Sequence, residues 1–200
     1  MLNIFKRILN RLELIIFDLL VRNTFKFCGK KSLLYSPYRL EGKKNIEIGS
    51  NTTMQKGGWL SCYPKVTDGE AILSIGSGCI LGYNNHIISA QSVTIEDYVL
   101  TANNVYISDN SHSYKDITKP IMFQGISLRG PVVIGSGTWL GENVCVVGAS
   151  VGKNCVIGSN SVVTHDIPDF SVAVGAPAKV IKRFSQADGI WISVEEDSGD

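Results

Sequence analysis

Aliphatic residues recur every six positions along much of this chain. The spacing is clearest in residues 134–163, and an earlier series runs through residues 75–107. A period of six fits neither an α-helix, with 3.6 residues per turn, nor a strand with two alternating faces. It fits a triangular parallel β-helix, in which each six-residue side contributes one inward aliphatic residue before the chain turns a corner. The recurring positions are Ile75, Leu81, Ile87, Ile95, Thr101, Ile107, Ile134, Leu140, Val146, Val151, Ile157 and Val163.

Two long breaks interrupt the series, at residues 55–74 and 108–133. A solenoid tolerates insertions at its corners, where a loop can leave without disturbing the aliphatic columns, and such loops often gather on the working face. The second break contains the polar run Asp-Asn-Ser-His-Ser-Tyr at residues 109–114. We therefore expect a protruding loop here, and we expect the chemistry to lie on it.

The charge is nearly balanced over the 200 residues, at +1, but it is unevenly placed. Residues 1–44 hold ten Lys/Arg and three Asp/Glu, a net +7, and residues 45–200 hold nine and fifteen, a net −6. A basic segment suits an anionic membrane or nucleic acid. No nucleic-acid-binding motif accompanies it, so we expect no nucleic-acid partner.

The N-terminal segment is expected to form an amphipathic helix. Its apolar run, residues 14–21, is interrupted by Asp18, is shorter than the ~20 residues of a spanning helix and lacks a signal-peptide cleavage site. We expect residues 1–38 to cover the open end of the solenoid, with peripheral contact at the inner face of a membrane as the alternative use. The expected apolar stripe is Ile4, Ile8, Leu12, Ile15 and Leu19, with Lys6, Arg7, Arg11 and Arg22 away from it.

The remaining divisions follow from the same pattern. Residues 39–184 are expected to form the β-helix, and residues 185–200 a C-terminal tail with an acidic end. The five cysteines form no Cys-x-x-Cys pair. An odd number of cysteines without an export signal is typical of the reducing cytoplasm, so we expect free thiols and a cytoplasmic location.

Four segments carry a resemblance to a known family. They are Ser108–His112, Pro131–Val144 with its tryptophan repeat, Ile157–Thr164, and the Gly-Ala-Pro-Ala-Lys element within Val174–Lys182. Residues 40–184 resemble the hexapeptide-repeat acyltransferases, especially bacterial sugar O-acetyltransferases that act on lipopolysaccharide and capsule sugars. The resemblance implies a left-handed parallel β-helix and a homotrimer with acetyl-CoA between neighbouring subunits. It also implies acetyl transfer to a sugar hydroxyl without a metal or a covalent acyl-enzyme.

The resemblance assigns the general base to His112. Neutral imidazole can take a proton from a hydroxyl near neutral pH, which this transfer requires. Two further histidines complete the set: His86, expected to face solvent or a neighbouring subunit, and His165, expected on the surface. A γ-type carbonic anhydrase needs three histidines, two of them close in sequence, and the separations here are 26 and 53 residues, so we reject a zinc site.

The acceptor and cofactor residues are also implied by the resemblance. The acceptor would meet Tyr83, Asn84, Asn85 and Asp109, and Asp109 could instead orient His112. The family's first active-site Asn is Gly82 here, which argues against a simple galactoside or maltose acceptor. Coenzyme A would meet Trp139, Gly141, Ser159, Thr164, Lys179 and Lys182.

Three functions compete at this point. The first is O-acetylation of a sugar in a surface polysaccharide or its precursor. The second is N-acetylation of an amino-sugar nucleotide, with a drug-modifying acetyltransferase close to both. The third is a non-catalytic solenoid, which would not need a histidine in a long loop.

Overall fold

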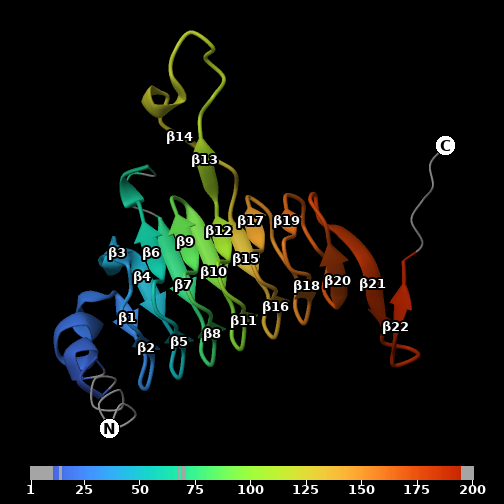
Figure 1. The fold of residues 1–200 in the computed structure, drawn as a ribbon, viewed down its shortest axis with the longest axis horizontal. Helices are drawn as coiled ribbons and strands as arrows, with labels where there is room; N and C mark the ends of the chain where they lie inside the picture. The colour runs from blue at the N-terminus through green and yellow to red at the C-terminus, as the bar shows by residue number, and fades with distance from the viewer. Residues whose placement is uncertain (1–10, 14, 67, 69–70, 195–200) are drawn as a thin grey trace, which may run out of the picture.

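The protein is a three-sided solenoid, seen in a computed structural model that describes residues 11–13, 15–66, 68 and 71–194 (Figure 1). The chain visits three parallel sheets in turn, so that each coil as far as β17 adds one strand to every side, and the later coils meet sheet A through isolated bridges at Val151 and Ile167. Sheet A holds β1 (Phe27–Cys28), β4 (Ile46–Ile48), β7 (Ile72–Ile75), β10 (Ser92–Ile95) and β15 (Val132–Ile134). Sheet B holds β2 (Leu33–Leu34), β5 (Thr53–Met54), β8 (Ile80–Leu81), β11 (Leu100–Thr101), β16 (Trp139–Leu140), β18 (Val156–Ile157), β20 (Ser171–Val174), β21 (Lys179–Ser185) and β22 (Ile190–Ser193). Sheet C holds β3 (Arg39–Glu41), β6 (Trp59–Cys62), β9 (His86–Ser89), β12 (Tyr106–Ser108), β17 (Cys145–Val147) and β19 (Val162–Val163).

The predicted aliphatic columns form the core. In sheet C, Leu60, Ile87, Ile107, Val146 and Val163 are successive neighbours in register, and all are buried. All twelve positions predicted from the sequence are buried. The six-residue period therefore identified the inward residues correctly, because every side of a coil turns one side chain into the shared interior.

Asparagines turn the corner between sheets B and C. Asn84, Asn104, Asn143 and Asn160 all have positive φ, between 55° and 61°. Asparagine tolerates this left-handed conformation better than most residues. Their side chains also bond between coils, as where Asn143 Nδ2 donates to Asn160 Oδ1 at 3.0 Å. The corner is thus a stacked polar ladder that holds successive coils in register.

The first predicted break is shorter than expected. Residues 59–62 form β6, which pairs with β3 and β9 and keeps Leu60 in the sheet C column. Among the described residues of this break, those that leave the solenoid lie between β6 and β7 and include the 3₁₀ turn η4 (Pro64–Val66). The prediction was wrong here because Leu60 and Ile75 are 15 residues apart, so the six-residue spacing does not continue across the segment between them.

The second predicted break is an arm, residues 109–131, that projects from the middle of the solenoid (Figure 1). It starts with an antiparallel pair, β13 (Asn110–His112) and β14 (Ile126–Leu128), and its far part contains the 3₁₀ turn η5 (Ile121–Phe123). The arm leaves after β12 of sheet C and returns to β15 of sheet A. The predicted protruding loop is therefore confirmed. His112 lies in β13, the strand with which the arm begins.

The solenoid begins before residue 39. β1 and β2 belong to the first coil, so its parallel strands start at Phe27, within the segment expected to be helical. In the described residues before β4, helix is confined to 11–13, 15–16, the π-helical turn η1 (Phe17–Val21) and the 3₁₀ turns η2 (Arg22–Thr24) and η3 (Lys43–Asn45). No described helix has the length and apolar character needed to cross a membrane.

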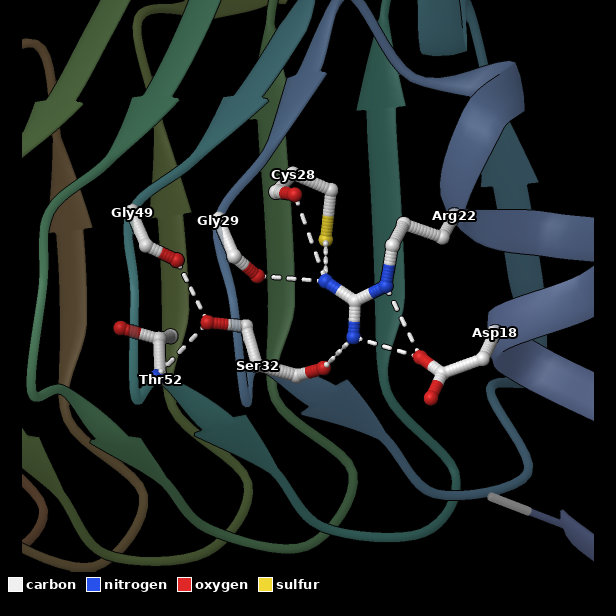
Figure 2. A network of polar contacts seen from close by, with 7 residues as sticks. All are labelled: Asp18, Arg22, Cys28, Gly29, Ser32, Gly49 and Thr52. Carbon is white, nitrogen blue, oxygen red and sulfur yellow. Dashed lines mark hydrogen bonds and ion pairs between the residues drawn. The ribbon is translucent and has the colours of Figure 1, made fainter. Parts of the chain in front are cut away.

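Arg22 joins this N-terminal segment to the first coil (Figure 2). Its guanidinium donates to the carbonyls of Cys28, Gly29 and Ser32, the last at 2.8 Å, and pairs with Asp18 at 2.6 Å. These carbonyls lie on the outermost coil, where no further strand is present to donate hydrogen bonds to them. Arg22 supplies donors in place of that strand. Arg22, which was expected to lie away from the apolar stripe, therefore binds the first coil of the solenoid.

The apolar stripe of the N-terminal helix was predicted to cover the solenoid, but it faces away from it. Phe17 is buried in the core, whereas Leu12, Ile15 and Leu19 are exposed. Because Phe17 and Arg22 both face the first coil, the other side of the helix is turned outward. Ile4, Ile8, Lys6 and Arg7 lie outside the described residues.

The C-terminal end of the solenoid differs from the rest. β21 runs antiparallel to β20, and β22 runs antiparallel to β21, so a hairpin closes this end of sheet B. Residues 190–193 of the predicted tail are therefore a strand. Residues 195–200, including its acidic end, lie outside the described part of the chain.

The cysteines are free thiols. Burial raises the pKa of each thiol, and that of Cys62 reaches about 11. Thiols with raised pKa values stay protonated near neutral pH and react slowly. Their role in the described structure is packing.

Candidate active site

His112 is the last residue of β13, at the base of the arm (Figure 1). It lies directly opposite Ile126 in the antiparallel pair, and the N–H of Ser113 donates to the carbonyl of Gly125 at 3.0 Å. The backbone is thus hydrogen-bonded on both sides of His112, while the side chain is exposed. A fixed backbone with a free imidazole suits a group that must accept a proton from a bound ligand.

Asp109 anchors the arm and does not touch His112. Its carboxylate accepts hydrogen bonds from the backbone N–H groups of residues 90–92 at 2.7–2.8 Å, from Ser89 Oγ at 3.1 Å and from Asn110 Nδ2 at 2.8 Å. It is completely buried. Five donors occupy the acceptor sites of one carboxylate, so none remains for an imidazole or a sugar. The structure gives Asp109 an anchoring role in place of the predicted contact with His112 or the acceptor.

The Asn-rich corner presents only part of the predicted acceptor set. Asn85 is fully buried, where its amide donates to the carbonyl of Ala102 at 3.0 Å and accepts from Thr101 Oγ1 at 3.0 Å. Its side chain therefore serves the solenoid and is not available to an acceptor. Tyr83 and Asn84 are exposed, and Asn84 belongs to the asparagine ladder, donating to Asn104 Oδ1 at 3.3 Å.

Several predicted cofactor residues share one outward row on sheet B. Trp139 is in register with Val156, Val156 with Val172, and Val172 with Lys182. Residues in register on neighbouring strands point to the same face, and strands lie about 4.8 Å apart, so the row spans roughly 14 Å. The Trp139 side chain is 43% exposed. The row thus places a free indole and a lysine along one open face.

Lys179 joins that face because of an irregularity in β21. Lys179 is opposite Val174, and the register shifts between Val172 and Ala173, leaving Ile181 without a partner on β20. Without the shift, residues 179 and 182 would point to opposite faces, since their spacing is odd. One extra residue in the strand restores the same side. Both amines are consequently exposed beside the row.

Gly141 and Ser159 form a narrow corner next to Trp139. A Cβ atom at Gly141 would lie 2.8 Å from the backbone nitrogen of Ser159, so the two coils approach closely only because this residue is Gly. Ser159 is exposed. Thr164 is also exposed, and its hydroxyl lies 3.1 Å from Nδ1 of His165.

Within one chain, the predicted general base and the predicted cofactor residues do not lie close together. His112 is on an arm that leaves the solenoid between sheets C and A, whereas Trp139 and Lys182 are on the outer face of sheet B. The predicted base and the predicted cofactor residues are therefore on different sides of the prism.

His86 is half-buried between neighbouring coils and so does not face solvent freely, while the other predicted position, against a neighbouring subunit, stays a prediction. Its ring is stacked on Trp59, with centroids 3.9 Å apart, and meets the edge of Tyr106 on its other side. Nε2 is buried without a hydrogen-bond partner among the described residues, and burial lowers the pKa of the imidazole. Sequence reasoning missed this packing because the three aromatic residues are 20–27 positions apart and meet only when coils stack.

The arm itself contains a feature that the sequence did not predict. A cavity of about 390 Å³ lies within it, lined by Tyr114, Phe123 and the cations Lys115, Lys119 and Arg129 among others. Ser127, which lines the cavity, lies opposite Ser111 in the antiparallel pair, so the two side chains are on the same face of the ribbon. Ser111 and His112 are adjacent in the strand and point to opposite faces, so the cavity and the imidazole are on opposite faces of the ribbon. Among the described residues, no group of three or more His, Cys, Asp or Glu could hold a metal ion.

The repeats match a known family. A profile for the hexapeptide repeat of succinyl-transferase matches residues 72–109 and 131–165, and the gap between the two matches is the arm. The chain is 32% identical over 180 residues to the putative lipopolysaccharide biosynthesis O-acetyl transferase of Escherichia coli (strain K12), covering 86% of this chain and 88% of that relative. The chain belongs to the hexapeptide-repeat acyltransferase family.

Two further comparisons place it within the family. It is 42% identical over 146 residues to a probable acetyltransferase of Mycobacterium tuberculosis, which covers 70% of this chain but 48% of that relative, about half its length. The solved structure of galactoside acetyltransferase in complex with coenzyme A is similar, with a TM-score of 0.60 and 26% identity over 88% of this chain and 74% of that chain. The predicted left-handed parallel β-helix is confirmed by this membership.

Proposed function

We propose that this protein is an acetyl-CoA-dependent O-acetyltransferase that modifies a hydroxyl of a sugar in a surface polysaccharide or its precursor. The observation that supports this most is the exposed imidazole of His112 on a hydrogen-bonded ribbon anchored by Asp109. The similarity to a putative lipopolysaccharide O-acetyl transferase along most of both chains favours oxygen over nitrogen as the acceptor atom and a surface sugar over a free galactoside.

In the proposed reaction, His112 acts as the general base. A neutral imidazole nitrogen takes the proton from the sugar hydroxyl while that oxygen bonds to the carbonyl carbon of the acetyl thioester. When the carbon–sulfur bond breaks, the imidazolium returns the proton to the leaving thiolate, so the products are the acetyl ester and free CoA. Backbone N–H groups at a corner would stabilise the negative charge on the carbonyl oxygen.

The donor would lie along the outer face of sheet B. Trp139 would pack on the donor, Lys179 and Lys182 would pair with its phosphates, and the exposed Ser159 and Thr164 would offer hydroxyls nearby. The tight corner at Gly141 lets an extended ligand pass close to the backbone. Tyr83 and Asn84 are the exposed members of the acceptor set.

His112 and the donor residues on sheet B would meet in a homotrimer. The arm of one subunit would carry His112 to the sheet B face of its neighbour, because one chain alone holds them on different sides. We place this trimer in the cytoplasm, where acetyl-CoA and sugar precursors are available.

The test is acetyl-CoA-dependent release of CoA across sugars, amino sugars, sugar nucleotides and lipid-linked oligosaccharides. His112→Ala is expected to lower turnover by about 10²–10⁴-fold while CoA still binds. His165→Ala is the matched control: His165 contacts Thr164 of the proposed donor set, so turnover at saturating acetyl-CoA is expected to stay at the wild-type level. Undiminished turnover in His112→Ala would overturn the assignment, and turnover on amino sugars alone would replace O-acetylation with N-acetylation.

A further inference from the structure

The outer side of the N-terminal helix is an unpartnered apolar stripe. Its members are spaced at i, i+3, i+4, i+7 and i+8, the pattern of one helix face. Such a face is normally buried, yet these side chains are 48–71% exposed. They are Leu12, Ile15, Ile16, Leu19 and Leu20.

Lysines without an ion-pair partner lie on the first coils, next to the N-terminal helical segment. All four carboxylates in the described part of residues 11–47 are held in ion pairs, joining Asp18 to Arg22, Lys26 to Glu47, Arg39 to Glu41 and Lys56 to Glu13. Four lysines of the first coils form no ion pair with any described residue. They are Lys30, Lys31, Lys43 and Lys44, and all but the half-buried Lys43 are exposed.

These lysines adjoin the helical segment. A surface hollow of about 220 Å³ is lined by Asp18 and Arg22 from the helical side and by Lys30 and Lys31 from the first coil. A second hollow, of about 610 Å³, joins Thr24 and Phe25 to the other lysine pair. Phe27, on β1 between them, is 57% exposed. The apolar stripe and the uncompensated cations thus share one end of the molecule, far from the C-terminal hairpin (Figure 1).

We infer that this end of the protein binds an anionic lipid surface. The stripe would enter the boundary between headgroups and acyl chains, and the four lysines would meet the negatively charged headgroups. The charge argument favours a membrane over a second copy of this chain in a two-fold contact, because such a contact places identical lysine rims against each other. The inference does not depend on the proposed acetyl transfer.

The experiment is co-sedimentation of the full chain with vesicles of phosphatidylcholine alone or mixed with phosphatidylglycerol. Binding is expected only to the anionic vesicles and is expected to weaken with added salt. Lys30→Gln with Lys31→Gln should lower the affinity roughly 30-fold, at about 1 kcal/mol for each lysine. Leu19→Ser with Leu20→Ser should lower it by at least about 100-fold. The matched controls at other sites are Lys153→Gln and Ile190→Ser, both at exposed positions, which should bind normally.

Other outcomes overturn the inference. Absence of vesicle binding, or equal binding to neutral and anionic vesicles, would remove the anionic surface as the partner. A lower oligomeric state of the Leu19→Ser, Leu20→Ser variant by light scattering would show that another copy covers the stripe. CoA release with a soluble acceptor should be unchanged in all of these variants, so failure here and failure of the proposed function are separate results.

Discussion

Trp139 and Lys182 lie in one outward-facing row of sheet B, separated by two strands whose row residues are valines. The aromatic ring and the amine are roughly 14 Å apart at a strand spacing of about 4.8 Å. An extended ligand with an apolar part and phosphates can contact both ends of such a row. The β-bulge in β21 adds Lys179 to the same face, so two cations gather at one end.

Loss of these lysines is expected to weaken donor binding selectively. Lys179→Gln and Lys182→Gln should each raise the KM for acetyl-CoA roughly tenfold, because a hydrogen bond to a charged group contributes about 1.5 kcal/mol. The KM for the acceptor should not change. Lys153→Gln, at an exposed corner on another part of the surface, is the control. Unchanged donor KM in both variants would show that phosphates bind elsewhere.

Asp109→Ala is expected to destabilise the fold as well as the arm. The substitution removes the buried carboxylate that accepts hydrogen bonds from the backbone N–H groups of residues 90–92. The free energy of unfolding should fall by about 3 kcal/mol or more, measured by urea denaturation. Asp166→Ala is the comparison, because that exposed carboxylate accepts one backbone hydrogen bond, from Ser150, and its loss should cost about 1 kcal/mol. Equal losses would contradict the anchoring role.

The sequence predicted the solenoid well because its signal repeats. Every inward position must hold a side chain that can be buried, so one period identifies the inward residues of all three sheets between Ile75 and Val163. The roles of polar side chains were harder to predict, because their hydrogen-bond partners lie on the neighbouring coil. Asn85 bonds to residues 16 and 17 positions away, and Asp109 to residues 17–20 positions away, so short-range motifs could not show that their side chains were already occupied.

The N-terminal segment shows a second reason why contacts could not be predicted from the sequence. An apolar helical period predicts which residues share a face but does not say what that face contacts. Here Phe17 and Arg22 fix the orientation, since one enters the core and the other binds the free carbonyls of the first coil. A single arginine with three carbonyl acceptors leaves no periodic trace in a sequence.

His86 is expected to make stability depend on pH. Burial lowers the folded-state pKa of its imidazole below the usual 6.5, so the unfolded chain binds more protons as the pH falls through that value. The contribution of His86 to stability is therefore fully present above pH 6.5 and is lost as the pH falls toward the folded-state pKa. Urea denaturation of wild type and His86→Phe over this range measures it. The difference between the two should shift in favour of the variant at low pH, and a constant difference would count against burial as the cause.

Mixed oligomers would show whether the site is shared between subunits. His112→Ala removes the proposed base from the arm, and Trp139→Ala combined with Lys182→Glu damages the sheet B row. Each protein alone should have little activity. When the two are co-expressed with different tags and purified through both, a site between subunits can combine the intact arm of one with the intact row of the other. Activity should then reappear, as measured by CoA release.

The same mixture discriminates against a site within one chain. If the arm of a subunit served its own row, every site in the mixed oligomer would lack either the base or the row, and no activity would return. Pairing His112→Ala with a second, differently tagged copy of His112→Ala is the control for assembly, since it forms the same oligomer without any intact base. Restored activity in the first mixture and none in the control would establish that adjacent subunits complete each other's site.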